Sequence, residues 1–172
     1  VAHMPIAVLG PGTGLGVSGL IPHRTGYTAI EGEGGHVSFS PYDALEADIW
    51  AHAKQHFDHV SAERLLSGAG LALIHAVLAQ NKESEAQVLS APHIINQALK
   101  DEHSLCCRSL EVFSAMLGSF AGNVALTLGA RGGVYVCGGM VPRFIKVFQQ
   151  SSFRTRFESK GRFKPYLAAI PV

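Results

Sequence analysis

Cysteine is scarce in this chain, and no two cysteines have the spacing of a metal site. Of the three cysteines in 172 residues, Cys106 and Cys107 are adjacent and Cys137 lies in an apolar run. This arrangement gives no disulfide framework and is typical of a reducing compartment, so we expect a cytoplasmic protein. Structural zinc sites need ligands at characteristic spacings such as Cys-x-x-Cys, which the sequence lacks. We therefore expect no metal beyond one carried by a ligand.

An excess of one charge and long apolar runs are also missing. The 14 Lys and Arg residues nearly balance 13 Asp and Glu residues, which gives a formal net charge of +1. No face is therefore reserved for nucleic acid or an anionic membrane. No uninterrupted apolar run reaches the roughly 18 residues of a transmembrane helix, and no secretory signal pattern opens the chain.

The composition is that of one globular domain with a substantial core. Hydrophobic residues make up 47% of the chain and charged residues 16%, and the length suits a single domain. Residues 1–4 resemble an expression remnant, so the expected domain covers residues 5–172.

Short apolar runs separated by glycine predict strands near the N-terminus. Residues 6–9, 17–21 and 26–30 are such runs, and the turns between them favour an antiparallel three-stranded meander. Further strands are predicted at 134–137 and 167–172, and a strand-like segment at 37–39.

Helical periodicity dominates the remainder, in the order expected for an α/β fold. Helices are predicted at 44–56, 71–80, 91–100, 104–128, 143–150 and 153–158, with a short connector at 61–68 and a surface loop at 81–87. In the longest helix, apolar residues recur every three or four positions. Gly118 and Gly122 lie among the small residues between them, so another element should approach this helix closely. Asn123, the lone amide there, is expected to make a structural hydrogen bond, with a site role as the alternative.

The stretch 31–36 is the first candidate site, because its glycines flank Glu33 and His36. Glycine permits positive φ and close approach of other groups. A carboxylate and an imidazole on such a loop could hold a small ligand rich in hydroxyls. The alternative is an ordinary turn with solvated side chains. Glu63 is a third candidate, either as a further hydroxyl ligand or as a surface ion pair with Arg64.

Two other glycine motifs suggest a phosphorylated ligand. Gly12, Thr13 and Gly14 follow a strand, where backbone N–H groups and a hydroxyl could surround an anion. The loop lacks the Gly-Lys-Ser/Thr of a Walker A motif, and it leads into a strand instead of the helix of a dinucleotide fold. Gly138 and Gly139 follow a predicted buried strand, where small residues would admit a nucleoside base. Hairpin and strand-end turns without a ligand are the alternatives.

Taken together and in order, the segments 12–16, 32–37, 59–68 and 132–144 closely resemble those of the bacterial-type glucokinases, and the similarity covers nearly all of residues 5–172. The resemblance implies a hexokinase-like fold of the actin/ribonuclease-H-like ATPase superfamily, with a mixed sheet packed with helices. It also implies roles for individual residues. Glu33, His36 and Glu63 would be glucose ligands, Gly12, Thr13 and Gly14 the second phosphate loop, and Gly138 and Gly139 the adenosine motif.

The implied activity is ATP-dependent phosphorylation of glucose at the 6-hydroxyl, which feeds glycolysis, with ATP bound as its Mg²⁺ complex. A homodimer is expected, and neither nucleic acid nor membrane as partner. Family members carry their general base, an aspartate, in a small N-terminal domain. We therefore expect an incomplete large domain truncated at both ends, with no catalytic acid or base and no turnover of its own. A sugar-sensing module and a dimerisation domain without kinase chemistry remain alternatives.

Overall fold

A four-stranded mixed sheet and one long helix organise the protein, in a computed structural model that describes residues 3–80 and 89–172. The strands are β1 (Ile6–Pro11), β2 (Leu15–His23), β3 (Gly26–Ile30) and β4 (Gly133–Val136). Their order is β3-β2-β1-β4, with antiparallel pairing in the meander and parallel pairing between β1 and β4. The predicted meander, mixed sheet and α/β class are confirmed.

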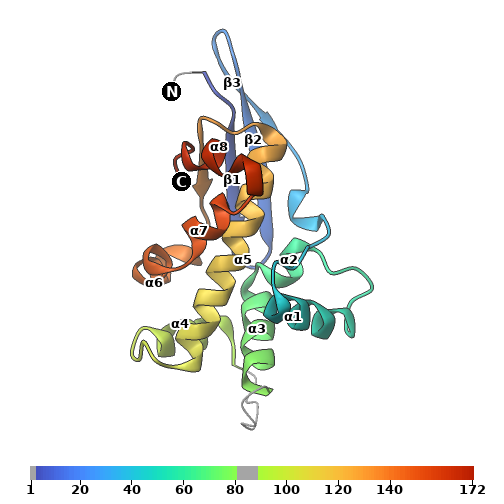
Figure 1. Ribbon diagram of the computed structural model, residues 1–172, viewed down its shortest axis with the longest axis vertical. Coiled ribbons are helices and arrows are strands. Elements are labelled where there is room, and N and C mark those ends of the chain that lie inside the picture. Colours follow the sequence, from blue (N-terminus) through green and yellow to red (C-terminus); the bar gives the residue numbers. More distant parts are fainter. Residues whose placement is uncertain (1–2, 81–88) are drawn as a thin grey trace.

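The helices form the larger part of the molecule (Figure 1). They are α1 (Ala44–Lys54), α2 (Ala62–Leu65), α3 (Gly68–Gln80), α4 (Ala91–Ala98), α5 (Leu105–Leu128), α6 (Ile145–Gln150), α7 (Phe153–Glu158) and α8 (Lys164–Ala168), with 3-10 turns η1 (Gly34–His36), η2 (Val141–Phe144) and η3 (Gly161–Phe163). Helix α5 runs through the middle of the view, with α3 and α4 against one end and the sheet at the other. The β2–β3 hairpin projects beyond the helices.

Helix α5 begins and ends where its sequence predicts. The Ser104 hydroxyl accepts a hydrogen bond from the Cys107 N–H at 3.1 Å, and Gly129 ends the helix with a φ of +60°. Gly118 and Gly122 lie directly under α7, where an added Cβ would collide with the carbonyl oxygens of Phe153 and Phe157. The close approach expected from these small residues is therefore confirmed, and α7 is the element that makes it.

Length and hydropathy alone would allow α5 to cross a membrane, but 78% of its most apolar 18-residue window is buried inside the protein. Its apolar face is the centre of the hydrophobic core. The core residues that α5 contributes include Leu110, Phe113, Leu117 and Phe120. We therefore describe α5 as a core helix.

A buried ion pair joins α1 to α7 behind this core. Arg156 of α7 donates a hydrogen bond to the carboxylate of Glu46, whose side chain is 2% exposed. The Arg156 Nε atom also donates to Ser119 Oγ on α5 at 3.1 Å, and the guanidinium lies 3.8 Å from the centre of the Tyr42 ring. The Asp43 carboxylate, which caps α1, is 3.6 Å from the same guanidinium. This cluster fixes the start of α1 against α5 and α7.

The predicted final strand at 167–172 is wrong. Helix α8 occupies its beginning, with Pro165 in the first turn, where the missing N–H is harmless. Arg154 donates to the carbonyl oxygens of Leu167, Ala168 and Ile170, which satisfies the end of that helix. A short apolar run does not by itself distinguish a buried helix from a strand.

The segment 37–39 is not a strand either, and the connector at 61–68 is largely helical. Ser38 makes a single bridge with Ser61, and pairing stops there because Ser61 caps α2. Helix α3 begins at Gly68, three residues before the predicted start. The predicted helix at 143–150 opens as the 3-10 turn η2 before α6. The predicted loop at 81–87 lies outside the described residues.

Candidate functional site

Glu33, His36 and Glu63 converge in space, although 30 residues separate the first from the last. The His36 Nε2 atom lies 3.9 Å from a carboxylate oxygen of Glu33 and 3.9 Å from one of Glu63. Glu33 precedes the turn η1, His36 ends it, and Glu63 lies in α2. The structure thus places two carboxylates near the same nitrogen of one imidazole.

Backbone hydrogen bonds hold the two segments together. The Ala62 N–H donates to the Val37 carbonyl at 2.9 Å, and the Phe39 N–H donates to the Val60 carbonyl at 3.0 Å. Because these bonds lie immediately after His36 and immediately before Glu63, they fix the distance between the two side chains. The Glu63 carboxylate is itself oriented by the Leu15 N–H, which donates to Oε2 at 3.0 Å.

Glycine allows close packing at two points around this cluster. A Cβ on Gly35 would overlap the carbonyl oxygen of Leu15, and a Cβ on Gly14 would lie 2.5 Å from Glu63 Oε2. Distances of that kind are below van der Waals contact, so any side chain at either position would displace η1 or Glu63. The glycines seen in the sequence therefore permit close packing, and neither of them has a positive φ.

The cluster is open to solvent on one side. The side chain of Glu33 is 89% exposed, that of His36 59% and that of Glu63 30%. Carboxylates accept hydrogen bonds from hydroxyl groups, and an imidazole can donate from one nitrogen and accept at the other. The arrangement can therefore bind a polyhydroxylated molecule. Among residues 3–80 and 89–172, no group of three His, Cys, Asp or Glu side chains has the geometry of a metal site.

The predicted phosphate loop lies beside this cluster. Residues 12–14 connect β1 to β2, and the Gly68 N–H at the start of α3 donates to the Gly12 carbonyl at 2.8 Å. Gly14 faces Glu63, whereas Gly12 and Thr13 line a neighbouring pocket of about 380 Å³. The loop therefore separates the carboxylate cluster from this pocket.

Gly139 lines the same pocket from the end of β4, so the structure brings the two predicted glycine motifs together. Gly138 adopts a φ of +85°, and an added Cβ there would lie 2.8 Å from the Pro11 carbonyl oxygen. Glycine is therefore needed at position 138, both for the positive φ and for the space that the Pro11 carbonyl oxygen takes. The pocket also includes Arg143 and the first turns of α4, which were not selected from the sequence. Arg143 lies in the segment 132–144, but no role was assigned to it there, and no motif marks α4.

Two minor expectations turn out differently. Arg64 does not pair with Glu63; its guanidinium lies 4.2 Å from the centre of the Phe57 ring. Asn123 is exposed, and within the described part of the chain its side-chain amide has no hydrogen-bond partner. It lines a separate hollow, described below.

A family model described as Glucokinase matches residues 1–172, which include the four residues that the sequence set apart from the domain. Curated glucokinases from Neisseria gonorrhoeae and Campylobacter jejuni subsp. doylei are 56% and 58% identical, over 100% and 99% of this chain. The crystal structure of a glucokinase from an Antarctic psychrotroph has a TM-score of 0.91 and 34% identity, and the match covers 99% of this chain and 53% of that one. The chain spans 52% of the length of each of these two curated relatives.

Proposed function

This chain belongs to the glucokinase family, and from that premise we propose that it binds glucose and ATP for transfer of the γ-phosphoryl group to the 6-hydroxyl of the sugar, a step that feeds glycolysis. The observation that supports this proposal is the convergence of Glu33, His36 and Glu63 beside the loop 12–14. Phosphoryl transfer depends chiefly on positioning two substrates and stabilising charge between them. A hydroxyl-binding cluster next to a glycine-rich anion loop is suited to both tasks.

The sugar would be held from one wall by charge-assisted hydrogen bonds. The carboxylates of Glu33 and Glu63 accept from sugar hydroxyls, while His36 bonds to a further oxygen between them. In Glu63, Oε2 already accepts the Leu15 N–H, so Oε1, which faces His36, remains for the sugar.

The donor nucleotide would occupy the pocket behind the loop. Thr13 and the backbone of Gly12 and Gly14 would bind the transferred phosphate, and Gly138 and Gly139 would lie against the nucleoside. ATP would enter as its Mg²⁺ complex, in which the cation neutralises phosphate charge. We assign no general base among the described residues, because His36 is better placed as a hydroxyl ligand. We therefore also propose that the 172-residue chain alone gives no measurable transfer, which a coupled assay would test.

A glucose titration with protein-observed NMR tests the sugar site directly. Glu33→Gln keeps the size of the side chain but removes its charge, and one charge-assisted hydrogen bond is worth about 1.5–3 kcal/mol. We expect glucose affinity to fall by about ten-fold or more. Glu102→Gln is the matched control, because its side chain is 86% exposed and far along the chain from the cluster. Equal glucose affinity in wild type and both variants would contradict the proposal.

A nucleotide titration separates a kinase from a sugar sensor. A non-hydrolysable ATP analogue with Mg²⁺ should shift the amide signals of residues 12–14 and 138–139, whereas a sugar-sensing module has no need to bind nucleotide. Binding of glucose without any response to the analogue would favour the sensor.

A homodimer and a cytoplasmic location remain part of the proposal. Ile21, Tyr27 and Ile30 are exposed apolar side chains on the projecting β2–β3 hairpin, a surface suited to self-association. Sedimentation equilibrium tests the dimer, and fractionation of the source cells tests the location.

A further inference from the structure

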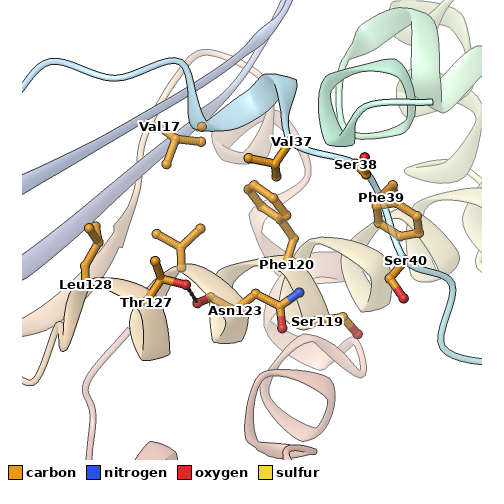
Figure 2. A pocket seen from close by; sticks show the side chains of 12 residues that line it. Val17, Val37, Ser38, Phe39, Ser40, Ser119, Phe120, Asn123, Thr127 and Leu128 are labelled. Atoms are coloured by element: carbon orange, nitrogen blue, oxygen red, sulfur yellow. Dashed lines mark hydrogen bonds between the residues drawn. The ribbon is translucent and has the colours of Figure 1, made fainter. Parts of the chain in front are cut away.

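A second hollow lies between β2, α5 and the segment that follows the sugar cluster (Figure 2). Its volume is about 200 Å³. Its lining residues are Val17, Gly34, Val37, Ser38, Phe39, Ser40, Ser119, Phe120, Asn123, Val124, Thr127 and Leu128. We call it the α5 pocket. It shares no lining residue with the predicted sugar or nucleotide sites.

The walls of the α5 pocket are apolar and uncharged. Val37 lies over the ring of Phe120 in Figure 2, and Val17 and Leu128 close the side nearest the sheet. No ionisable side chain lines the pocket. A charged ligand would therefore lose its hydration without gaining a partner, whereas a neutral apolar body would gain from burial.

Two polar side chains that line the α5 pocket, Ser40 and Asn123, have no hydrogen-bond partner among the described residues. The hydroxyl of Ser38 is paired with His59 Nε2 at 3.0 Å, and that of Ser119 accepts from Arg156 at 3.1 Å. The Asn123 amide, by contrast, has no partner among residues 3–80 and 89–172, and it can both donate and accept. It projects from the α5 wall in Figure 2.

The volume limits the ligand to about one ring. An engineered apolar cavity of about 150 Å³ holds benzene, so about 200 Å³ accepts a six-membered ring with a short substituent. The chemistry of the walls requires this ring to be uncharged, and Asn123 favours a single hydroxyl or amide group on it.

The α5 pocket is also connected to the sugar cluster through the backbone. Gly34 and Val37 line it, while His36, which lies between them in sequence, faces Glu33 and Glu63. Val37 is 53% exposed, so a ligand beneath it would add contacts that the segment lacks. A ligand that orders residues 34–40 would reduce the ordering cost of the next ligand to bind there.

We propose that the α5 pocket binds small neutral ring-bearing molecules with one hydroxyl or amide group. A ligand bound there orders residues 34–40 and thereby strengthens glucose binding, and this effect on glucose rests on the proposed function. Thermodynamic linkage requires the converse, that glucose strengthens binding at the α5 pocket by the same factor.

Benzyl alcohol is the probe, and benzoate, which has the same ring and a negative charge, is the ligand control. Titrations of the 172-residue chain followed by NMR should show saturable benzyl alcohol binding at α5 and residues 34–40, with a Kd of about 1 mM. Benzoate should not saturate. Asn123→Leu removes the amide at an exposed position and should weaken binding about five-fold or more. Asn96→Leu, at an exposed position of α4, is the matched control and should bind as wild type does.

The coupling between the α5 pocket and the sugar cluster is measured in two ways, and only one of them requires glucose. Saturating benzyl alcohol should slow amide hydrogen exchange in residues 34–40 and should lower the glucose Kd by about two- to five-fold. Thr127→Phe, which fills the hollow from another exposed position of α5, should abolish the binding of the probe.

The site would be overturned if benzyl alcohol shows no saturable binding, or if Asn123→Leu and Thr127→Phe leave its binding unchanged. Equal binding of benzoate and benzyl alcohol would overturn it as well. Binding that leaves both hydrogen exchange in 34–40 and glucose affinity unchanged would overturn the coupling. If benzyl alcohol binds and slows exchange while glucose does not bind at all, the α5 pocket is supported and the proposed function fails.

Discussion

Removing the positive charge of Arg156 should destabilise the protein more than any ordinary surface substitution. Arg156→Met would leave the Glu46 carboxylate, 2% exposed, facing a methionine side chain in place of its cationic partner. The remaining hydrogen bond from the Tyr42 N–H, at 2.9 Å, does not neutralise that charge. Breaking a buried ion pair by removing one member typically costs about 3–5 kcal/mol.

That cost is large relative to the total stability of a domain, which is about 5–15 kcal/mol. For a chain of this size, about 1 kcal/mol corresponds to about 2–4 °C in Tm. We therefore expect Arg156→Met to lower Tm by about 6–20 °C. Thermal unfolding followed by circular dichroism, together with urea titration, measures both quantities. Arg108→Met is the matched control, because Arg108 lies exposed on α5, and it should change stability by about 0.5 kcal/mol at most.

A double-mutant cycle tests the stated cause. Glu46→Gln preserves the acceptor for the Tyr42 N–H but removes the negative charge, so the double variant contains no uncompensated buried ion. We expect the loss of stability in the double variant to be about 1–3 kcal/mol smaller than the sum of the losses in the two single variants. The reasoning would be refuted if the effects simply add, or if Arg156→Met unfolds at the same temperature as Arg108→Met.

Three further predictions test other parts of the structure. Gly138→Ala should destabilise the fold by about 1–3 kcal/mol, because residue 138 has a positive φ and the new Cβ would lie close to the Pro11 carbonyl oxygen. Gly139→Ala should be tolerated, because no atom lies within 4 Å of its new Cβ. Equal Tm values for the two variants would contradict this prediction. Burial lowers the pKa of His75 below 6.5, so the unfolded state binds the extra proton first and stability falls as pH drops below about 6.5. His75→Gln should flatten urea midpoints measured across that range, and His103→Gln, at an exposed site, should not. Iodoacetamide should label the exposed Cys137 before the two cysteines of α5, whose pKa values burial raises, as mass spectrometry of timed samples will show.

Local elements were predictable where one physical requirement governs them. The three N-terminal runs, separated by glycine, are a meander because short apolar segments with tight turns have few other ways to pair. Helix α5 was predictable from the apolar residues that recur every three or four positions along it. Where two requirements compete, prediction failed. The run 167–172 is apolar enough for a strand, but Pro165 and the carbonyl-binding side chain of Arg154 favour a helix there.

The residues of the sugar cluster were selected from the sequence, but their roles remain predictions. Glycines around Glu33 and His36 marked one segment. Glu63 was a candidate from its place in a short connector, with an ion pair to Arg64 as the alternative, and the family resemblance favoured the ligand role. The distances of 3.9 Å to His36 could not be predicted, since they depend on the backbone bonds that join the two segments. The pocket contributions of Arg143 and α4 were missed. Arg143 lies in the segment 132–144, but an exposed arginine there suggested no role, and the short helix α4 carries no motif.

The sequence by itself determined the family, the N-terminal meander and most of the helices. The meander and the helices follow from local periodicity, tight turns and capping. The tertiary structure alone decided which of the candidate groups meet, that Arg156 is buried with Glu46, and that a neutral hollow lies behind the segment carrying His36. The reason is that these side chains meet through contacts between segments tens of residues apart in sequence. The pattern of one segment does not indicate which other segment will pack against it.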